Sequence, residues 1–450
     1  MLKIYLDWNI ITKLKFDKKK SRELLCAIEE YRNYFIFPYS MAHLHDLRSG
    51  NEYCKGYHID LENLCTICET HLLEYNGDID GAYPYQCTPK EYLEQKKDEF
   101  AVFSSGFSEE SFANMLSNQG IDFSIFMDEL SKVEIAPVEI PFLNVKVRNA
   151  KDGLETVFRL GEQYARDKSV SGKIFKYLKD MTPDCQFREI MSSNNDTIFH
   201  VLDSITNQQV NKSFVEIIKD FQTQKNDMYF FISLYLALNA SGFNSDKKKS
   251  ILNIYTDAEH CYYASKCDLL VSEDENLREK ASAMYKLLGI RTTIMETKEF
   301  IRFMETEAKQ EYDLINFWKN IAPEYGKPTR EEGEQLFYKQ LPIRFFGFFN
   351  FCVETDNLYK NLKPFVLRLV LPPNGFVYFT ELERFFSLID VLLTEEGRKA
   401  FREQYKDVFM TRDKEKIMRA SFTIDLGDCL MQLRADPDSV IPLPMMLLAR

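Results

Sequence analysis

The segment DAEHCYYASKCDLLVSEDENLREKA, residues 257–281, carries the strongest structural signal in this chain. It predicts a helix that begins at the carboxylate of Asp257, then a short buried strand over 269–272. A second carboxylate, Asp274, follows directly after that strand. A strand that brings an acid to its C-terminal edge, beside a helix that begins with another acid, is typical of metal sites in α/β folds. The segment therefore predicts one half of a metal site.

The first 50 residues supply the other half. Residues 2–6 form a nearly continuous apolar run that ends at Asp7, which is typical of a buried parallel strand. Residues 34–37 predict a second strand, and Ser40 is placed to cap the helix that contains Asp46. Short strands alternating with helices predict a parallel sheet flanked by helices.

The chain is expected to divide into three parts. Residues 1–50 and 226–300 form the split α/β core, which includes an apolar helix over 228–238. Residues 51–225 are a large, mostly helical insertion. Residues 305–450 form an α+β accessory domain, in which the aromatic segment 345–351 is interpreted as a core strand rather than a base-stacking surface.

Four acids occupy equivalent places in the predicted sheet: Asp7, Asp46, Asp257 and Asp274. The carboxyl ends of parallel strands share one edge, so these carboxylates would repel one another unless a cation lay among them. Mg²⁺ or Mn²⁺ prefers such oxygen ligands and can activate water. Taken singly, each acid also has a structural interpretation, as a helix cap or a solvated side chain, but the joint pattern favours a site.

The composition agrees with a globular protein that carries a local site. The 450 residues are 45% hydrophobic, and the net charge of -12 argues against binding nucleic acid or membranes by bulk attraction. No signal peptide or membrane-spanning run is evident, so a cytoplasmic location with no membrane contact is expected. The ten cysteines are then expected to be reduced.

Three segments resemble the PIN-domain nuclease family: YLDWNI at 5–10, PYSMAHLHDL at 38–47, and the segment at 257–281. The last includes Ser272, two residues before the final acid, as in the PIN motif. The resemblance covers about residues 1–50 and 226–300. It implies a PIN-like fold and a divalent-metal-dependent ribonuclease with Asp7, Asp46, Asp257 and Asp274 as catalytic, metal-binding residues. The family more often has Glu at the second position, and Glu273 and Glu275 are alternatives near the fourth.

Other residues in these segments are expected to support the site. They are Asn9, Ser40, His43, His260 and Ser272. A histidine there could relay a proton or contact a phosphate, but we favour a role in orienting the acids. Cys65 and Cys68 suggest zinc, yet their spacing in a predicted helix favours core packing. The basic clusters 15–22 and 247–249 are either a phosphate-binding rim or solvated turns.

The sequence thus predicts a metal-dependent endonuclease, with RNA, most simply single-stranded, as its substrate. A DNA or structure-selective nuclease with the same site is one alternative. A catalytically degenerate PIN-like scaffold that binds a protein partner is another. The length of the chain suggests a toxin-like or anti-phage defence effector, restrained by its own extra domains, a regulatory partner or homo-oligomerisation.

Overall fold

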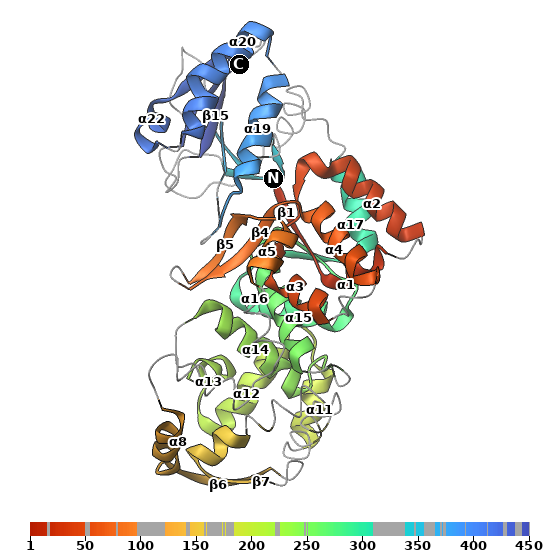
Figure 1. Ribbon diagram of the computed structural model, residues 1–450, viewed down its shortest axis with the longest axis vertical. Helices are drawn as coiled ribbons and strands as arrows, with labels where there is room; N and C mark the ends of the chain where they lie inside the picture. The colour runs from red at the N-terminus through yellow and green to blue at the C-terminus, as the bar shows by residue number, and fades with distance from the viewer. Residues whose placement is uncertain are drawn as a thin grey trace. The chain divides into compact units, whose positions relative to one another are not determined.

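The computed structural model is a mixed α/β structure with a parallel sheet flanked by helices (Figure 1). It describes residues 1–449 except 16–18, 50–54, 78–79, 97–121, 141–144, 157–158, 160–172, 174–175, 177–183, 221–225, 247–248, 250, 309–337, 346–347, 355–364, 370, 372–374, 392, 412, 426–429 and 437–442.

The chain forms two compact units, and both are discontinuous in sequence. One contains Met1–Ile4, Lys18–Phe37 and Lys298–Arg450, and the other contains Tyr5–Asp17 and Pro38–Thr297. The acids and histidines expected at the site all belong to the second unit. The three-part division expected from the sequence stays a prediction.

The parallel sheet has the strand order β2-β1-β8-β9. These strands are β1 (Leu2–Leu6), β2 (Phe35–Ile36), β8 (Leu269–Val271) and β9 (Thr293–Met295). The pairs β1–β2 and β8–β9 are parallel. All three residues of β8 are buried, which explains its continuous run of apolar residues. The predicted strands therefore exist, and they form the predicted parallel sheet.

Helices pack around this sheet in the second unit (Figure 1). The helix α15 (Ile251–Ala264) contacts β8, α3 (Met41–Ser49), α14 (Asp227–Ser241) and α16 (Glu275–Leu288). The expected apolar helix is confirmed as α14, and its buried residues follow helical spacing: Met228, Phe231, Ile232, Leu234, Tyr235 and Leu238. A glycine at position 289 predicts the end of a helix, and α16 does end there, with a left-handed C-cap at a φ of 66°.

The expectation that a helix begins at Asp257 is wrong. The helix α15 begins at Ile251, and Asp257 lies in its middle. Ile254, Ala258 and Cys261 are all buried and follow helical spacing, so the apolar face extends upstream of the acid. Asp257 is therefore held by the helix on both sides and is not a cap.

Within the insertion, the polar and periodic run over residues 60–75 predicts a helix, and this prediction is wrong in its second half. The helix α4 (Lys55–Cys68) ends before Glu69, which has a φ of 53°, and His71–Asn76 form strand β4. This strand pairs in parallel with β3 (Tyr39–Ser40) and antiparallel with β5 (Gly81–Gln86). The run HLLEYN is too short for periodicity to separate strand from helix, and pairing decides its structure.

The rest of the predicted insertion combines helices with a β-hairpin. The prolines and β-branched residues at 135–147 predict an extended segment. The structure confirms it as the antiparallel pair β6 (Glu134–Ile140) and β7 (Val145–Asn149). The helices are α5 (Pro89–Gln95), α8 (Phe123–Ser131), α11 (Asp184–Ser192), α12 (Ile198–Val210) and α13 (Phe214–Asp220). The region therefore contains more strands than its sequence suggests. A short helix, α1 (Trp8–Lys13), follows β1.

The first unit contains a six-stranded antiparallel sheet in the order β10-β11-β12-β15-β14-β13. The strands are β10 (Tyr338–Phe345), β11 (Phe349–Glu354), β12 (Phe365–Arg368), β13 (Ser421–Asp425), β14 (Leu430–Ala435) and β15 (Pro444–Ala449). The described helices of this unit are α2 (Lys19–Tyr31), α17 (Thr297–Phe303), α19 (Phe379–Val391), α20 (Glu395–Phe401), α21 (Asp407–Met410) and α22 (Lys414–Arg419), with single turns at Arg32–Tyr34, Met304–Ala308 and Arg402–Lys406.

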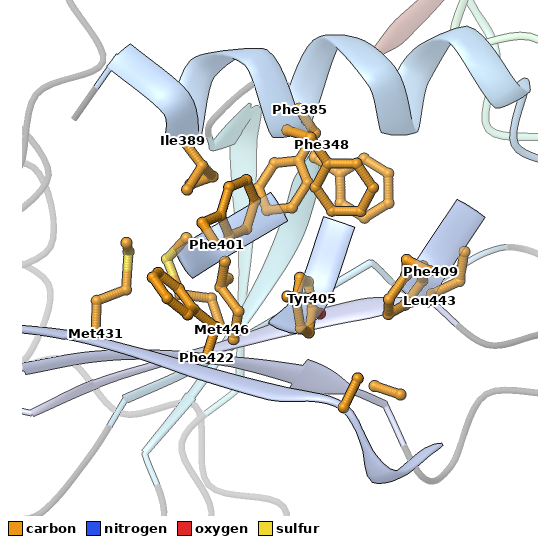
Figure 2. Close-up of a cluster of buried hydrophobic side chains, with 14 of the residues drawn as sticks. Phe348, Phe385, Ile389, Phe401, Tyr405, Phe409, Phe422, Met431, Leu443 and Met446 are labelled. Carbon is orange, nitrogen blue, oxygen red and sulfur yellow. The ribbon is translucent and has the colours of Figure 1, made fainter. Parts of the chain in front are cut away.

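A cluster of buried aromatic side chains joins these helices to the sheet (Figure 2). The rings of Phe348 and Phe385 stack with their centroids 5.0 Å apart. Phe386 contacts the rings of Phe401 and Tyr405 in edge-on geometry. Phe348 and Phe349 are fully buried, so these two residues of segment 345–351 belong to the core, as predicted.

No helix among the described residues is long and apolar enough to cross a membrane. The described cysteines that are free thiols are Cys26, Cys65, Cys68, Cys87, Cys261 and Cys267. Cys68 is buried in α4, and its carbonyl oxygen lies 2.9 Å from Nδ1 of His71. This arrangement agrees with core packing for the cysteine pair of α4.

Candidate active site

The four predicted acids come together at one edge of the parallel sheet. Asp7 follows β1 directly, and Asp274 is the N-cap of α16, three residues beyond the end of β8. Asp46 comes from α3 and Asp257 from α15, and these two helices pack against each other. The main-chain nitrogen of Asp7 donates to the carbonyl of Val271 across 2.9 Å, which fixes the ends of β1 and β8 side by side.

The charges of these carboxylates act on one another. The pKa of Asp7 is raised by burial and also by the charges of Asp46 and Asp274, although His260 and Ser272 oppose the shift. The pKa of Asp257 is raised to about 7, mainly by burial and further by Asp7 and Asp274. Raised carboxyl pKa values are expected where several acids are gathered away from water. The sequence prediction that these acids converge is thus supported by their electrostatics.

Asp7 is held by two polar side chains from the predicted segments. The hydroxyl of Ser272 donates to Oδ2 of Asp7 across 2.6 Å, and Nδ2 of Asn9 donates to the same oxygen. Ser272 also accepts a hydrogen bond of 3.0 Å from the main-chain nitrogen of Asp274. Ser272 therefore links the first acid to the fourth, and the two supporting residues expected beside Asp7 are in contact with it.

A buried cluster of histidines lies behind the acids. Nε2 of His260 lies 2.8 Å from Oδ2 of Asp46, while its Nδ1 lies 2.9 Å from the hydroxyl of Tyr5. That hydroxyl also lies 2.7 Å from Oγ of Ser40 and 3.3 Å from Nδ1 of His43. The cluster therefore connects β1, β3, α3 and α15 beneath the site.

The pKa values of the two histidines in this cluster are shifted in opposite directions. Burial and the neighbouring His260 lower the pKa of His43, whose Nε2 lies 2.8 Å from the carbonyl oxygen of Leu6. Burial also acts to lower the pKa of His260, but its bond to Asp46 and the charges of Asp46, Asp7 and Asp257 outweigh burial and raise it. The acids therefore favour the charged form of His260, whereas burial favours the neutral form of His43. Both contact patterns agree with an orienting role.

A lysine that the sequence analysis did not assign to the site lies among the acids. Nζ of Lys249 is 2.7 Å from Oδ2 of Asp257 and 2.7 Å from Oδ2 of Asp274. These contacts help to lower the pKa of Asp274 in spite of burial. The basic run that contains Lys249 was visible in the sequence, but nothing in the run indicates that one member turns toward the acids. Lys247 and Lys248 lie outside the described residues.

Two other sequence expectations concern residues that point elsewhere. Oε1 of Glu273 accepts a hydrogen bond of 3.1 Å from the main-chain nitrogen of Thr297, so Glu273 is engaged away from Asp274. Nζ of Lys15, in the first basic cluster, forms an ion pair of 2.7 Å with Asp60. The contact between His45 and Glu259 was not predicted from the sequence; Nδ1 of His45 lies 2.9 Å from Oε2 of Glu259.

The donor set suits a hard divalent cation, because its four members are carboxylates. Among the described residues, no three His, Cys, Asp or Glu side chains are arranged to hold a metal ion together. Lys249 accounts for part of this difference, since it occupies one oxygen of Asp257 and one of Asp274. His260 likewise engages Oδ2 of Asp46. The chemistry of the acids fits Mg²⁺ or Mn²⁺, but a cation bound by Asp257 and Asp274 must replace the lysine.

Comparisons of the chain with protein-family models, with curated proteins and with solved structures find no match. The functional interpretation therefore depends on the geometry of the acids and on the sequence motifs that bring them together.

Proposed function

We propose that this protein is a divalent-metal-dependent nuclease with a PIN-like site, and that RNA is its substrate. The observation that carries the proposal is the convergence of Asp7, Asp46, Asp257 and Asp274 at the carboxyl edge of β1 and β8. Ligand sites in parallel α/β sheets form at this edge. Four carboxylates gathered at one sheet edge repel one another unless cations lie among them, so their presence favours a role in cation binding.

The residues of the site have two roles: some would bind a cation, and others orient the acids. Asp7, Asp257 and Asp274, with Asp46, would hold Mg²⁺ or Mn²⁺. When bound, such a cation supplies a Lewis acid that activates water and neutralises charge on a phosphodiester. Ser272 fixes the orientation of Asp7, and His260 fixes that of Asp46. Pre-set orientation of this kind is what supporting residues contribute to metal sites.

Single-stranded RNA is the substrate that best suits this site. The side chains of Asp46 and Asp274 are 25% and 24% exposed, so the acids are recessed but reachable. A flexible single strand can bend its backbone toward recessed acids more readily than a duplex can. With a net charge of -12, the protein must bind its substrate by local contacts rather than by bulk attraction.

The test is a cleavage assay with Mn²⁺ on a mixed RNA pool, with single-stranded and duplex DNA in parallel. Asp7→Asn and Asp274→Asn should each reduce cleavage by ~100-fold or more, because each removes charge that the cation needs. Asp227→Asn is the matched control, since Asp227 pairs with Lys266 in the same unit. Full activity in both site variants would refute the proposal, and preference for DNA would favour the DNA nuclease alternative.

A second candidate function is a catalytically degenerate scaffold that binds a protein partner. The observation in its favour is Lys249, whose ammonium group already neutralises Asp257 and Asp274. In that case the acids and the lysine would form a permanent ion-pair network. Absence of Mn²⁺ binding to the wild-type protein by calorimetry would favour the scaffold over the nuclease.

A further inference from the structure

The position of Lys249 is built into the fold. Lys249 lies in the turn between α14 and α15, and the main chain of this turn is closed by a hydrogen bond of 3.2 Å from the nitrogen of Lys249 to the carbonyl of Asp246. The main-chain nitrogen of Asp246 in turn donates to Oδ1 of Asn239, across 2.9 Å. The start of the turn is therefore attached to the end of α14.

The same turn is attached to α16 by buried charge. Nζ of Lys280 lies 2.6 Å from Oδ2 of Asp246, and both side chains are buried. Nδ2 of Asn276 donates to the other oxygen of Asp246 across 2.9 Å. Two helices therefore hold Asp246 in place, and Lys249, three residues later, is carried to the acids by an anchored turn.

The ammonium group of Lys249 and a divalent cation need the same atoms. Each N–O distance from Lys249 to Asp257 and Asp274 is 2.7 Å, which is the length of a strong charge-assisted hydrogen bond. A cation that coordinates these oxygens would lie within the space that the ammonium fills, and two like charges would repel there. Occupancy by lysine and occupancy by the cation at these two oxygens are therefore mutually exclusive.

Lys249 also has a route out of the site. Its side chain is 29% exposed, whereas that of Lys280 is fully buried. A lysine has a long flexible stem and a strongly hydrated ammonium group, so hydration offsets part of the cost of leaving the acids. The anchored turn keeps the group near the acids after it leaves, and so it can return when the cation dissociates.

We propose that Lys249 is a tethered competitor for the divalent cation: it occupies Asp257 and Asp274 in the metal-free protein and leaves when Mg²⁺ or Mn²⁺ binds. The inference rests on the proposed nuclease function, which it extends to the control of metal loading. Tethering gives the ammonium a high effective concentration, so the competition weakens the apparent affinity for the cation. The lysine also shields the two acids from each other when no metal is bound.

Calorimetric titration with Mn²⁺ tests this inference without any measurement of activity. Lys249→Met should bind Mn²⁺ about tenfold or more tightly than the wild type, because the cation no longer has to displace an ammonium group. Lys249→Arg keeps a competing cation and should bind no more tightly than the wild type. The matched control is Lys266→Met, which removes a partly buried lysine paired with Asp227 and should leave the affinity unchanged.

A thermal-shift measurement protects the test against a folding defect in Lys249→Met. In a metal chelator this variant should unfold at a lower temperature than the wild type, because Asp257 and Asp274 lose their shared partner. Addition of Mn²⁺ should then raise its unfolding temperature by more than that of the wild type. Equal or weaker Mn²⁺ binding by Lys249→Met would overturn the competitor inference while leaving the nuclease proposal intact. Absence of binding in both proteins would overturn the two together.

Discussion

Nε2 of His260 lies 2.8 Å from Oδ2 of Asp46, although the two residues are 214 positions apart in sequence. The imidazole is fully buried and comes from α15, whereas the carboxylate comes from α3 and is 25% exposed. This contact joins the two sequence segments that supply the site. It also gives the second acid, which the sequence placed with the least support, a specific partner inside the protein.

The Asp46–His260 contact predicts how His260 titrates. In the metal-free wild-type protein the pKa of His260 should lie above 6.5, because the bond to Asp46 and nearby negative charge outweigh burial. In Asp46→Asn the strongest opposing contribution is removed, and burial should bring this pKa below 6.5. NMR titration of the imidazole resonances measures both pKa values. The chain has only six histidines, so few resonances need to be assigned.

The control for this titration is Glu259→Gln, which removes the acid next to His45 and leaves Asp46 in place. It should leave the His260 titration above 6.5. An unchanged His260 pKa in Asp46→Asn would contradict the assignment of Asp46 as the residue that raises this pKa.

Removal of the Ser272 hydroxyl should disturb the alignment of Asp7 without removing any charge from the site. Ser272→Ala removes the hydroxyl that donates to Asp7 and accepts from the main chain of Asp274. All four acids remain, so the loss of cleavage should be limited to ~10- to 100-fold, as is typical when the partner of a metal ligand is removed. The weaker activity should appear as a higher Mn²⁺ concentration for half-maximal rate.

Ser265→Ala provides the comparison for Ser272, because the hydroxyl of Ser265 bonds only locally to the carbonyl of Tyr262, across 2.5 Å. It should leave the Mn²⁺ dependence of cleavage unchanged. Wild-type Mn²⁺ dependence in the Ser272→Ala variant would show that the serine does not position Asp7.

Removal of the buried ammonium group of Lys280 should cause a large loss of stability. Its fully buried ammonium group pairs with Asp246 across 2.6 Å and donates to Asn239 across 3.0 Å. Lys280→Met leaves the carboxylate of Asp246 buried without this cation, so the free energy of unfolding should fall by ~3–5 kcal/mol. Denaturant unfolding followed by circular dichroism measures this difference.

Lys286→Met tests whether burial is the cause. Lys286 lies on the same helix, α16, and its pair with Asp196 is 64% exposed on both sides. Its removal should change the free energy of unfolding by less than ~1 kcal/mol. Equal losses in the two variants would show that helix α16, rather than the buried pair, is sensitive to loss of any lysine.

Much of the fold could be predicted from the sequence because strand ends and helix caps leave local signals. The apolar run before Asp7, the run before Asp274 and the glycine at 289 each indicated an element that exists. The convergence of the acids followed from the rule that parallel strands share a carboxyl edge. Where an acid followed a strand, its place in the site was therefore accessible to sequence reasoning.

The remaining features depend on contacts between distant segments, which local patterns do not encode. Asp257 resembled a helix cap, but the buried stripe that includes Ile254 starts the helix at Ile251. The segment HLLEYN continued a helical pattern, yet pairing with β3 and β5 makes it a strand. Lys249 belonged to a basic run that could be either a phosphate-binding rim or a solvated turn, and nothing local indicates that its side chain contacts two acids.

Asp257 predicts a pH dependence for the stability of the metal-free protein. Burial raises its pKa from 3.8 to about 7, and the partial compensation by Lys249 does not cancel this shift. Between these two pH values the folded protein keeps a proton that the unfolded chain releases. The contribution of this carboxyl to the free energy of unfolding therefore has its full value below about pH 4. It is lost as the pH rises through 7.

Asp257→Asn removes the titrating group, so its stability should decline less than that of the wild type between pH 5 and pH 8. The difference should be on the order of a few kcal/mol at most, since one pKa unit corresponds to about 1.4 kcal/mol. Thermal unfolding in a chelator at several pH values measures it, and the more exposed Asp227→Asn should follow the wild-type curve. Parallel curves for the wild type and Asp257→Asn would contradict a raised pKa, because only a group that holds its proton differently in the two states makes stability depend on pH.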